Sequence, residues 1–296
     1  MTPVWRSLQY VPAHVEKYVS SPHISAADAV ILDLEDSVPA DRKAIARAGL
    51  ETAIRTVARA GADVLVRIND GDLAAGDIAA AVQPGVAALV IPKVRDAARL
   101  KQLDQLVTDA EAATGLASGS VRFVVLIETA DGFLDMLAIA RATPRVIAIN
   151  LGNEDFAFDL GMAASEETLL MPRQQLAIVA AAAGILPLGL MGPATRFDDP
   201  AAYRALALKS RRFGFVGSSC IHPSQIEILN EAFAPTAEEV AEARRLVQAA
   251  EEAEADGRGA FAIDGRMIDR PIVARAEALV RKHQVIATRR TRGEGP

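Results

Sequence analysis

Residues 29–38 read AVILDLEDSV, and this stretch decides the fold of the chain. Its first four side chains are apolar without alternation, which is typical of a strand covered on both faces in a parallel sheet. Asp33, Glu35 and Asp36 then place three carboxylates where the strand is expected to end. In barrels of parallel strands the functional groups gather at these carboxyl ends, so the stretch predicts both a strand and part of a site.

The same pattern recurs along the chain, with helical stretches long enough to be crossover helices between the runs. The other predicted strands are residues 7–12, 64–69, 87–93, 122–128, 145–152, 185–190 and 215–223. Eight strand–helix units predict a (β/α)8 TIM barrel. A doubly wound open sheet is the alternative. It is less favoured because no G-x-G-x-x-G motif follows the first strand and no G-x-x-x-x-G-K-[ST] motif is present.

The predicted domain organisation has three parts. Residues 1–233 form the barrel, residues 234–286 form a C-terminal helical extension and lid, and residues 287–296 form a disordered tail. The extension begins with Thr236 and Glu239 at the spacing of a capping box, which marks a helix start.

Composition excludes several classes of protein. The 296 residues are 51% hydrophobic and carry a net charge of −6, so a large core is available and nucleic acid is an unexpected partner. The single cysteine, Cys220, excludes an internal disulfide framework and predicts a reducing, cytoplasmic location. Cys220 itself lies in an apolar segment and is expected in the core rather than as a nucleophile. Residues 176–195 carry no charge, but glycines and prolines interrupt them, so we expect no membrane span.

Polar residues end most of the predicted strands. Arg67, Lys93, Glu128 and His222 all follow apolar runs, and Asp155 comes shortly after another. Carboxylates without a Cys/His cluster favour a hard oxygen-ligand site for Mg²⁺. A planar guanidinium such as that of Arg67 matches a substrate carboxylate. A Schiff base on Lys93, in a metal-free aldolase, is the alternative chemistry.

Several stretches, taken together, resemble one family. They are RSLQYVP, DAVILDLEDSVPADRKAIAR, VLVRIN, LVIPKV, LIETADGFLDM, NLGNEDFAFDLG, CIHPSQIEILNEAFAPTAEEVAEAR and DGRMIDRPIVARA, and they cover residues 6 to 276 in order. The chain resembles the HpcH/HpaI aldolase and citrate lyase β-subunit family, and within it the citrate-lyase-like acyl-CoA lyases.

The resemblance implies roles for particular residues. Glu128 and Asp155 would hold Mg²⁺, Arg67 would bind the substrate carboxylate, and Asp269 would act as acid or base in a neighbouring subunit's site. Glu154 and His222 would also contact the ligand. Asp33, Glu35 and Asp36 would hold the cationic and metal side of the site in place, and Lys43 and Arg47 would assist either with coenzyme A phosphates or with these acids. For Asp269 a purely structural role as a helix N-cap stays open, because Asp-Arg-Pro is a good helix start.

The resemblance further implies a Mg²⁺-dependent lyase that cleaves a thioester such as malyl-CoA or citramalyl-CoA to acetyl-CoA and a 2-oxo acid. It also implies a homo-oligomer, a trimer or hexamer. Where such proteins have P-G-x after the first strand, this chain has Pro12-Ala13-His14. Two alternatives therefore stay open, an aldolase on free 2-oxo acids and a malyl-CoA thioesterase. A third is a non-catalytic subunit that works within a citrate-lyase-like complex.

Overall fold

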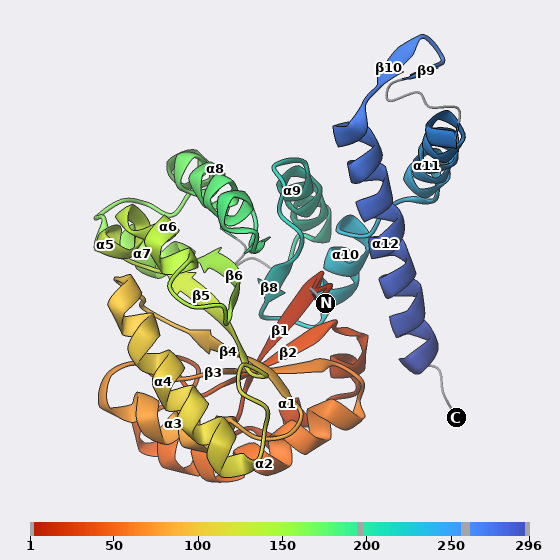
Figure 1. Ribbon diagram of the computed structural model, residues 1–296. Coiled ribbons are helices and arrows are strands. Elements are labelled where there is room, and N and C mark those ends of the chain that lie inside the picture. Colours follow the sequence, from red (N-terminus) through yellow and green to blue (C-terminus); the bar gives the residue numbers. More distant parts are fainter. Residues whose placement is uncertain (1–2, 194–197, 256–260, 294–296) are drawn as a thin grey trace. The chain divides into compact units, whose positions relative to one another are not determined.

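The computed structural model describes residues 3–193, 198–255 and 261–293. The chain divides into two compact units, residues 1–233 and 234–296 (Figure 1). No helix in the described part of the chain is both long enough and apolar enough to cross a membrane.

The first unit is a barrel of eight parallel strands. In chain order they are β1 (Ser7–Pro12), β2 (Ala29–Asp33), β3 (Asp63–Arg67), β4 (Val86–Ile91), β5 (Arg122–Ile127), β6 (Val146–Leu151), β7 (Leu186–Leu188) and β8 (Ser218–Cys220). Each strand from β1 to β7 pairs with the next one, and β8 pairs with β1. A parallel bridge between Leu188 and Gly217 joins β7 to the β8 segment and closes the ring. The TIM barrel predicted from the sequence is confirmed.

Helices connect the strands and cover the outside of the barrel. The longer ones are α2 (Lys43–Arg59), α3 (Ala74–Ala81), α4 (Ala97–Thr114), α8 (Glu166–Ala183), α9 (Pro200–Arg212) and α10 (Ser224–Ala232). Figure 1 shows α2, α3 and α4 along one side of the barrel and α8 and α9 along the opposite side. Short helices lie in the loops at α1 (Glu16–Val19), η1 (Pro22–Ala26), η2 (Ala40–Arg42), η3 (Gly71–Leu73), α5 (Ala130–Leu134), α6 (Met136–Ala140) and α7 (Asn153–Asp159).

Apolar side chains form two cores, one on each face of the sheet. The inner core fills the barrel with residues such as Leu8, Ile31, Val90 and Leu126. The outer core lies between strands and helices and is much larger. Because both faces are covered, the strands read as continuous apolar runs, which is why the sequence pattern was informative.

The predicted strands run one or two residues too long at several carboxyl ends. The strand that begins at Ala29, for example, was expected to reach residue 35 but ends at Asp33. Gly184 ends α8 with the left-handed backbone that glycine permits.

The second unit contains α11 (Ala237–Ala255), a hairpin of β9 (Phe261–Ile263) and β10 (Arg266–Ile268), and α12 (Arg270–Gly293). The capping box at its start is formed, with Glu239 accepting from the Thr236 amide and the Thr236 hydroxyl accepting from the Glu239 amide. A disordered tail over residues 287–296 was predicted, but residues 287–293 belong to α12. Apart from its final glycine this segment contains no helix breaker, so the helix continues through it.

A buried ion pair fixes the loop between α4 and β5. Glu111 is fully buried and accepts hydrogen bonds from the amides of Gly119 and Val121, each at 2.8 Å. Arg145 donates to both Glu111 oxygens, at 2.8 and 2.7 Å. Burial alone would raise the pKa of Glu111, but Arg145 and the two amides outweigh it and lower the pKa to about 2.

Replacing Glu111 by glutamine is expected to destabilise the barrel by about 2–3 kcal/mol, because the buried Arg145 loses one of its two carboxylate partners among the described residues and keeps Asp104. The free energy of unfolding, measured in urea at pH 7, checks this. Since the folded pKa of Glu111 lies below the unfolded value of 4.5, the wild-type advantage is complete above pH 4.5 and is lost as the pH falls toward 2. Glu51→Gln, at an exposed pair, is the control and should change stability by less than about 1 kcal/mol. An equally small effect of Glu111→Gln would contradict the prediction.

Candidate active site at the barrel mouth

The side chain of Arg67, at the end of β3, is held by the acids that end β2. Its Nε and Nη2 donate to the two oxygens of Asp33 at 2.6 and 2.7 Å. Asp33 is fully buried and also accepts from the amides of Glu35 and Ser37. Burial alone would raise the pKa of Asp33, but the hydrogen bonds and charge of Arg67 outweigh it and lower it. The guanidinium is therefore fixed at two points.

The other two acids of the stretch reach the remaining edge of Arg67. Arg67 Nη1 lies 2.9 Å from Glu35 Oε2 and 3.2 Å from Asp36 Oδ2. Glu35 is buried, whereas the Asp36 side chain is 55% exposed. The ring of Tyr10 lies under the guanidinium, with 4.8 Å between Arg67 Cζ and the ring centroid, in a cation–π contact. The structure thus shows Arg67 bridging acids, and its outward edge faces the exposed Asp36.

Lys93 follows β4 and links two parts of the site. Its Nζ lies 2.8 Å from Glu35 Oε1, and its backbone has a φ of 52°, which is uncommon for a residue other than glycine. In this conformation the Lys93 amide donates to Glu128 Oε2 at 2.7 Å. The hydrogen bond with Glu35 raises the pKa of Lys93. A protonated amine is a poor nucleophile, so this arrangement argues against the Schiff-base alternative.

Lys43 and Arg47, at the start of α2, are tied to the protein itself. Lys43 Nζ donates to the backbone oxygens of Leu34 and Glu35, at 3.1 and 3.0 Å, and to Asn69 Oδ1. Arg47 Nε donates to the buried Asp77 at 2.7 Å. Asp77 in turn accepts from the backbone and side-chain nitrogens of Asn69. These contacts hold the loops after β2 and β3 together.

Glu128, directly after β5, is a second closely packed carboxylate of the mouth. Its side chain is buried, and the backbone of Gly152 packs against it so closely that a Cβ there would lie 2.5 Å from Glu128 Cγ. Burial, the largest cause, and the charges of Glu35 and Asp155 together raise the pKa of Glu128 to about 7, against the lowering effects of the Lys93 amide and of Arg67. The site therefore has a surplus of negative charge at Glu128.

Glu154 and Asp155 lie in the first turn of α7, directly after β6, and both are exposed. Asp155 is near enough to Glu128 for its charge to act on that carboxyl group. The β6–α7 connection thus brings a solvent-facing carboxylate to the buried one.

His222, after β8, is exposed, and its Nδ1 lies 2.8 Å from the hydroxyl of Ser224. The amides of Ile221 and His222 both donate to Oε1 of the buried Gln225. Cys220 is buried, as predicted, and burial raises the pKa of its thiol, so it is not poised as a nucleophile.

Asp269 belongs to the second unit and precedes α12. Its side chain is exposed, and its Oδ1 accepts from the amide of Ile272 at 3.3 Å, the contact of an N-cap. The other predicted site residues all belong to the first unit.

Several further residues of the mouth had no role predicted from the sequence. Tyr10, Asn69, Asp77, Gly152 and Gln225 all contact the predicted groups. Asn69 was visible as a polar strand end, but its partner Asp77 lies within a helix and gives no pattern of its own.

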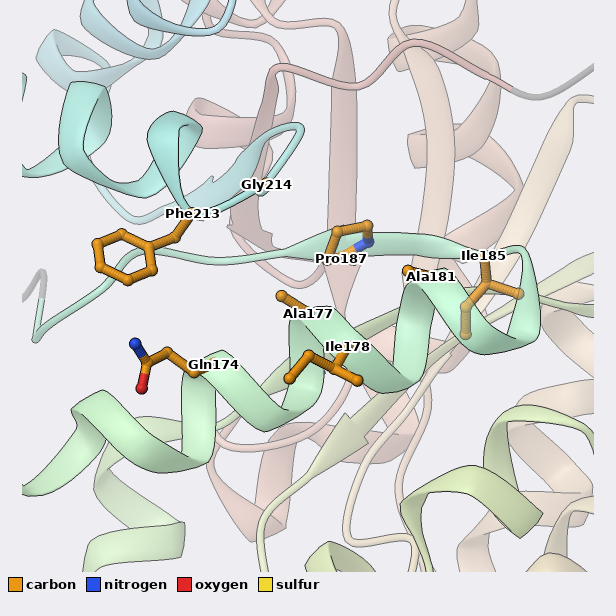
Figure 2. A pocket seen from close by; sticks show the side chains of 8 residues that line it. All are labelled: Gln174, Ala177, Ile178, Ala181, Ile185, Pro187, Phe213 and Gly214. Carbon is orange, nitrogen blue, oxygen red and sulfur yellow. The ribbon is translucent and has the colours of Figure 1, made fainter. Parts of the chain in front are cut away.

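A groove of about 680 Å³ lies elsewhere, on the outer surface along α8. Figure 2 shows Gln174, Ala177, Ile178 and Ala181 along one helix face, with Phe213, Gly214 and Pro187 across from them. None of the predicted site residues lines this groove, so it is separate from the candidate active site.

Comparisons with known proteins agree with this architecture. The family model for HpcH/HpaI aldolase/citrate lyase matches residues 6–223. The citrate lyase subunit beta of Leuconostoc mesenteroides subsp. cremoris is 34% identical over 280 residues, which cover 93% of this chain and 92% of that protein. The L-malyl-CoA/beta-methylmalyl-CoA lyase of Cereibacter sphaeroides is 38% identical over 300 residues, with the same coverage of both chains.

Solved structures show the same likeness. The protein CitE from Mycobacterium tuberculosis, in complex with magnesium, acetoacetate and coenzyme A, is 28% identical with a TM-score of 0.72, covering 96% of this chain and 98% of that one. A citrate lyase from Burkholderia xenovorans has a TM-score of 0.81 at 20% identity, covering 97% of this chain and 93% of that one, and supports the fold alone. From the extent of the family match and these identities, the chain belongs to the HpcH/HpaI aldolase/citrate lyase family.

Proposed function

We propose that this chain is a Mg²⁺-dependent carbon–carbon lyase that cleaves a 3-hydroxyacyl-CoA thioester to acetyl-CoA and a 2-oxo acid. The observation that carries the proposal is the arrangement of Glu128, a buried carboxylate with surplus negative charge, close to Asp155 and to the fixed cation Arg67. The named lyases among its relatives support the same class of reaction. Malyl-CoA and citramalyl-CoA are the first candidate substrates.

The residues of the mouth fit a divalent cation. A cation next to Glu128 would offset the burial and the repulsion from Asp155 that raise its pKa. The described residues contain no group of three or more Asp, Glu, His or Cys with metal-site geometry. Glu128 and Asp155 would thus leave the other ligand positions to water and substrate oxygen, as is usual for Mg²⁺. The structure of CitE with magnesium and coenzyme A supports this assignment.

Each residue then has a defined task. Bound Mg²⁺ would supply positive charge that stabilises the substrate oxygen when its hydroxyl loses its proton, before the carbon–carbon bond breaks. Arg67 would neutralise the substrate carboxylate through its outward edge, while Asp33 keeps the guanidinium from turning away. Glu154 and His222 would contact the substrate from the β6 and β8 ends.

Asp269 would come from a neighbouring subunit, take up the proton of the substrate hydroxyl and return it to the acetyl-CoA enolate once the carbon–carbon bond has broken. The chain is therefore proposed to be a homo-oligomer, a trimer or hexamer. Light scattering at micromolar concentration tests this, and a monomer that retains full turnover would contradict it.

The direct test of the function is acetyl-CoA release from malyl-CoA and citramalyl-CoA, with Mg²⁺ and with excess EDTA. Release that EDTA abolishes is the expected result. Hydrolysis to free coenzyme A without acetyl-CoA would favour the thioesterase, and turnover of free 2-oxo acids alone would favour the aldolase. The Pro12-Ala13-His14 loop motivates both of these alternatives. Metal binding without any turnover would favour a subunit that acts within a complex.

Asp269→Asn is expected to lower kcat by about 10²-fold, since asparagine caps a helix as well as aspartate but does not supply a proton. Asp269→Ser, which introduces another good N-cap without a carboxyl group, should lower kcat in the same way and shows that the effect does not depend on asparagine. A variant that keeps its helix content by circular dichroism and full kcat would assign Asp269 to the cap alone.

A further inference from the structure

Arg173, on α8, is a buried cation without a counter-ion. Its side chain is 2% exposed, and no carboxylate among the described residues forms an ion pair with it. Burial lowers the pKa of Arg173 to about 9, and no neighbouring acid offsets this effect. A buried charge that lacks a partner is strongly unfavourable, so a protein that keeps one has a use for it.

Only one edge of the guanidinium is satisfied within the protein. Nη2 donates to the backbone oxygen of Leu151 at 3.3 Å and to Oδ1 of Asn153. Among the described residues, Arg173 Nε and Nη1 have no hydrogen-bond partner, and neither has the buried Oδ1 atom of Asn150. These unsatisfied groups converge beside Gly189, where a Cβ would collide with both Arg173 Nη1 and Asn150 Oδ1. With a φ of +126°, this position favours glycine, and the missing side chain lets both Arg173 Nη1 and Asn150 Oδ1 lie against the Gly189 backbone.

The convergence lies close to the candidate active site. Asn150 is in register with Leu126 on β5 and Leu188 on β7, and both of these belong to the inner core of the barrel. Residues in register project to the same face, so Asn150 points into the barrel. Glu128 lies two residues beyond Leu126, which places Asn150 about 7 Å deeper along the barrel than the proposed metal ligand.

We propose that Arg173 and Asn150 bind the distal carboxylate of a dicarboxylic 2-oxo acid. This inference rests on the proposed function, because the other end of the acid would lie at Arg67, Glu128 and Asp155. The Asn150 amide can turn to present its nitrogen, so that two donors meet one carboxylate oxygen. A monocarboxylic acid, such as the glyoxylate or pyruvate released from malyl-CoA or citramalyl-CoA, leaves Arg173 buried and without a carboxylate. The inference therefore ranks a thioester that releases a dicarboxylic 2-oxo acid above these two first candidates.

The test uses pairs of acids that differ only at the distal end. Binding of 2-oxoglutarate against 2-oxopentanoate, and of oxaloacetate against 2-oxobutanoate, is measured by calorimetry on the full chain with Mg²⁺. In at least one pair the diacid is expected to bind about 10- to 100-fold more tightly. Equal binding within both pairs overturns the inference and leaves the proposed function intact, and a water molecule would then be the occupant. If no 2-oxo acid binds, the proposed function fails together with it.

Two variants locate the preference. Asn150→Asp gives Arg173 a carboxylate of the same size from within the protein, so the ratio within the pair should fall to near one while the melting temperature rises. Arg173→Met should also abolish the ratio, and the exposed Arg204→Met is the matched control that keeps it. A ratio that persists in Asn150→Asp and Arg173→Met would show that the second carboxylate binds elsewhere and would overturn the assignment.

Discussion

Replacing Glu128 by glutamine is expected to lower Mg²⁺-dependent turnover by about 10³-fold or more. Glutamine has nearly the same size and can still accept the hydrogen bond from the Lys93 amide. It carries no negative charge, so the cation loses its buried ligand and the developing charge on the substrate loses its stabilisation. Turnover of malyl-CoA and citramalyl-CoA, together with Mg²⁺ affinity by calorimetry, measures the effect.

The fold should tolerate this change. Burial and the neighbouring carboxylates raise the pKa of Glu128 to about 7, so the ionised form is disfavoured in the metal-free protein. The melting temperature in EDTA is therefore expected to stay the same or rise. Glu167→Gln, at an exposed position of α8, should leave metal affinity unchanged and serves as the control. Full Mg²⁺-dependent turnover by the Glu128 variant would refute the assignment of the metal site.

Replacing Arg67 by lysine is expected to reduce kcat/KM by about 10³-fold. A lysine keeps the charge but cannot hold Asp33 at two points while it faces a substrate carboxylate. Truncating one partner of a buried charge pair costs about 2–5 kcal/mol, so the folded state should also lose stability. Steady-state kinetics and the free energy of unfolding are measured on the same variant.

Ligand-binding measurements separate a role of Arg67 in substrate binding from a role in holding the acids together. The structure shows Arg67 bridging Asp33, Glu35 and Asp36, and this bridging alone would explain its burial. If the folded Arg67→Lys protein binds pyruvate in the presence of Mg²⁺ as tightly as the wild type, the arginine serves only the acids. A large loss of affinity, absent in the control Arg122→Lys at an exposed position, would assign it to the substrate.

The acids that end the first stretch show where sequence reasoning succeeds. Residues 29–32 are apolar, and the strand that they form is buried on both faces. A buried parallel strand that ends in carboxylates is expected to place them at the rim of a barrel. The pattern therefore predicts that the carboxyl ends of β2, β3, β4 and β5 lie together. Asp33, Arg67 and Glu35 are indeed in contact.

The partners within that group were not predictable. Lys43 was expected among the acids, yet its ammonium lies on two backbone oxygens and on Asn69. Glu111 and Arg145 form a buried ion pair, although neither stands out in the sequence. Arg173 interrupts an apolar helix, which is a signal, but only the structure shows that its Nε and Nη1 have no partner.

By itself, the sequence determined the strands, the barrel and the edge at which the polar groups meet. The hydrophobic effect is not directional, so the spacing of apolar residues along the chain is enough to place strands and helices. Only the tertiary structure decided which cation holds which acid, where a main-chain oxygen replaces a carboxylate, and which charge stays unpaired. These outcomes depend on donor and acceptor atoms about 3 Å apart on segments distant in sequence, and such distances leave no pattern along the chain.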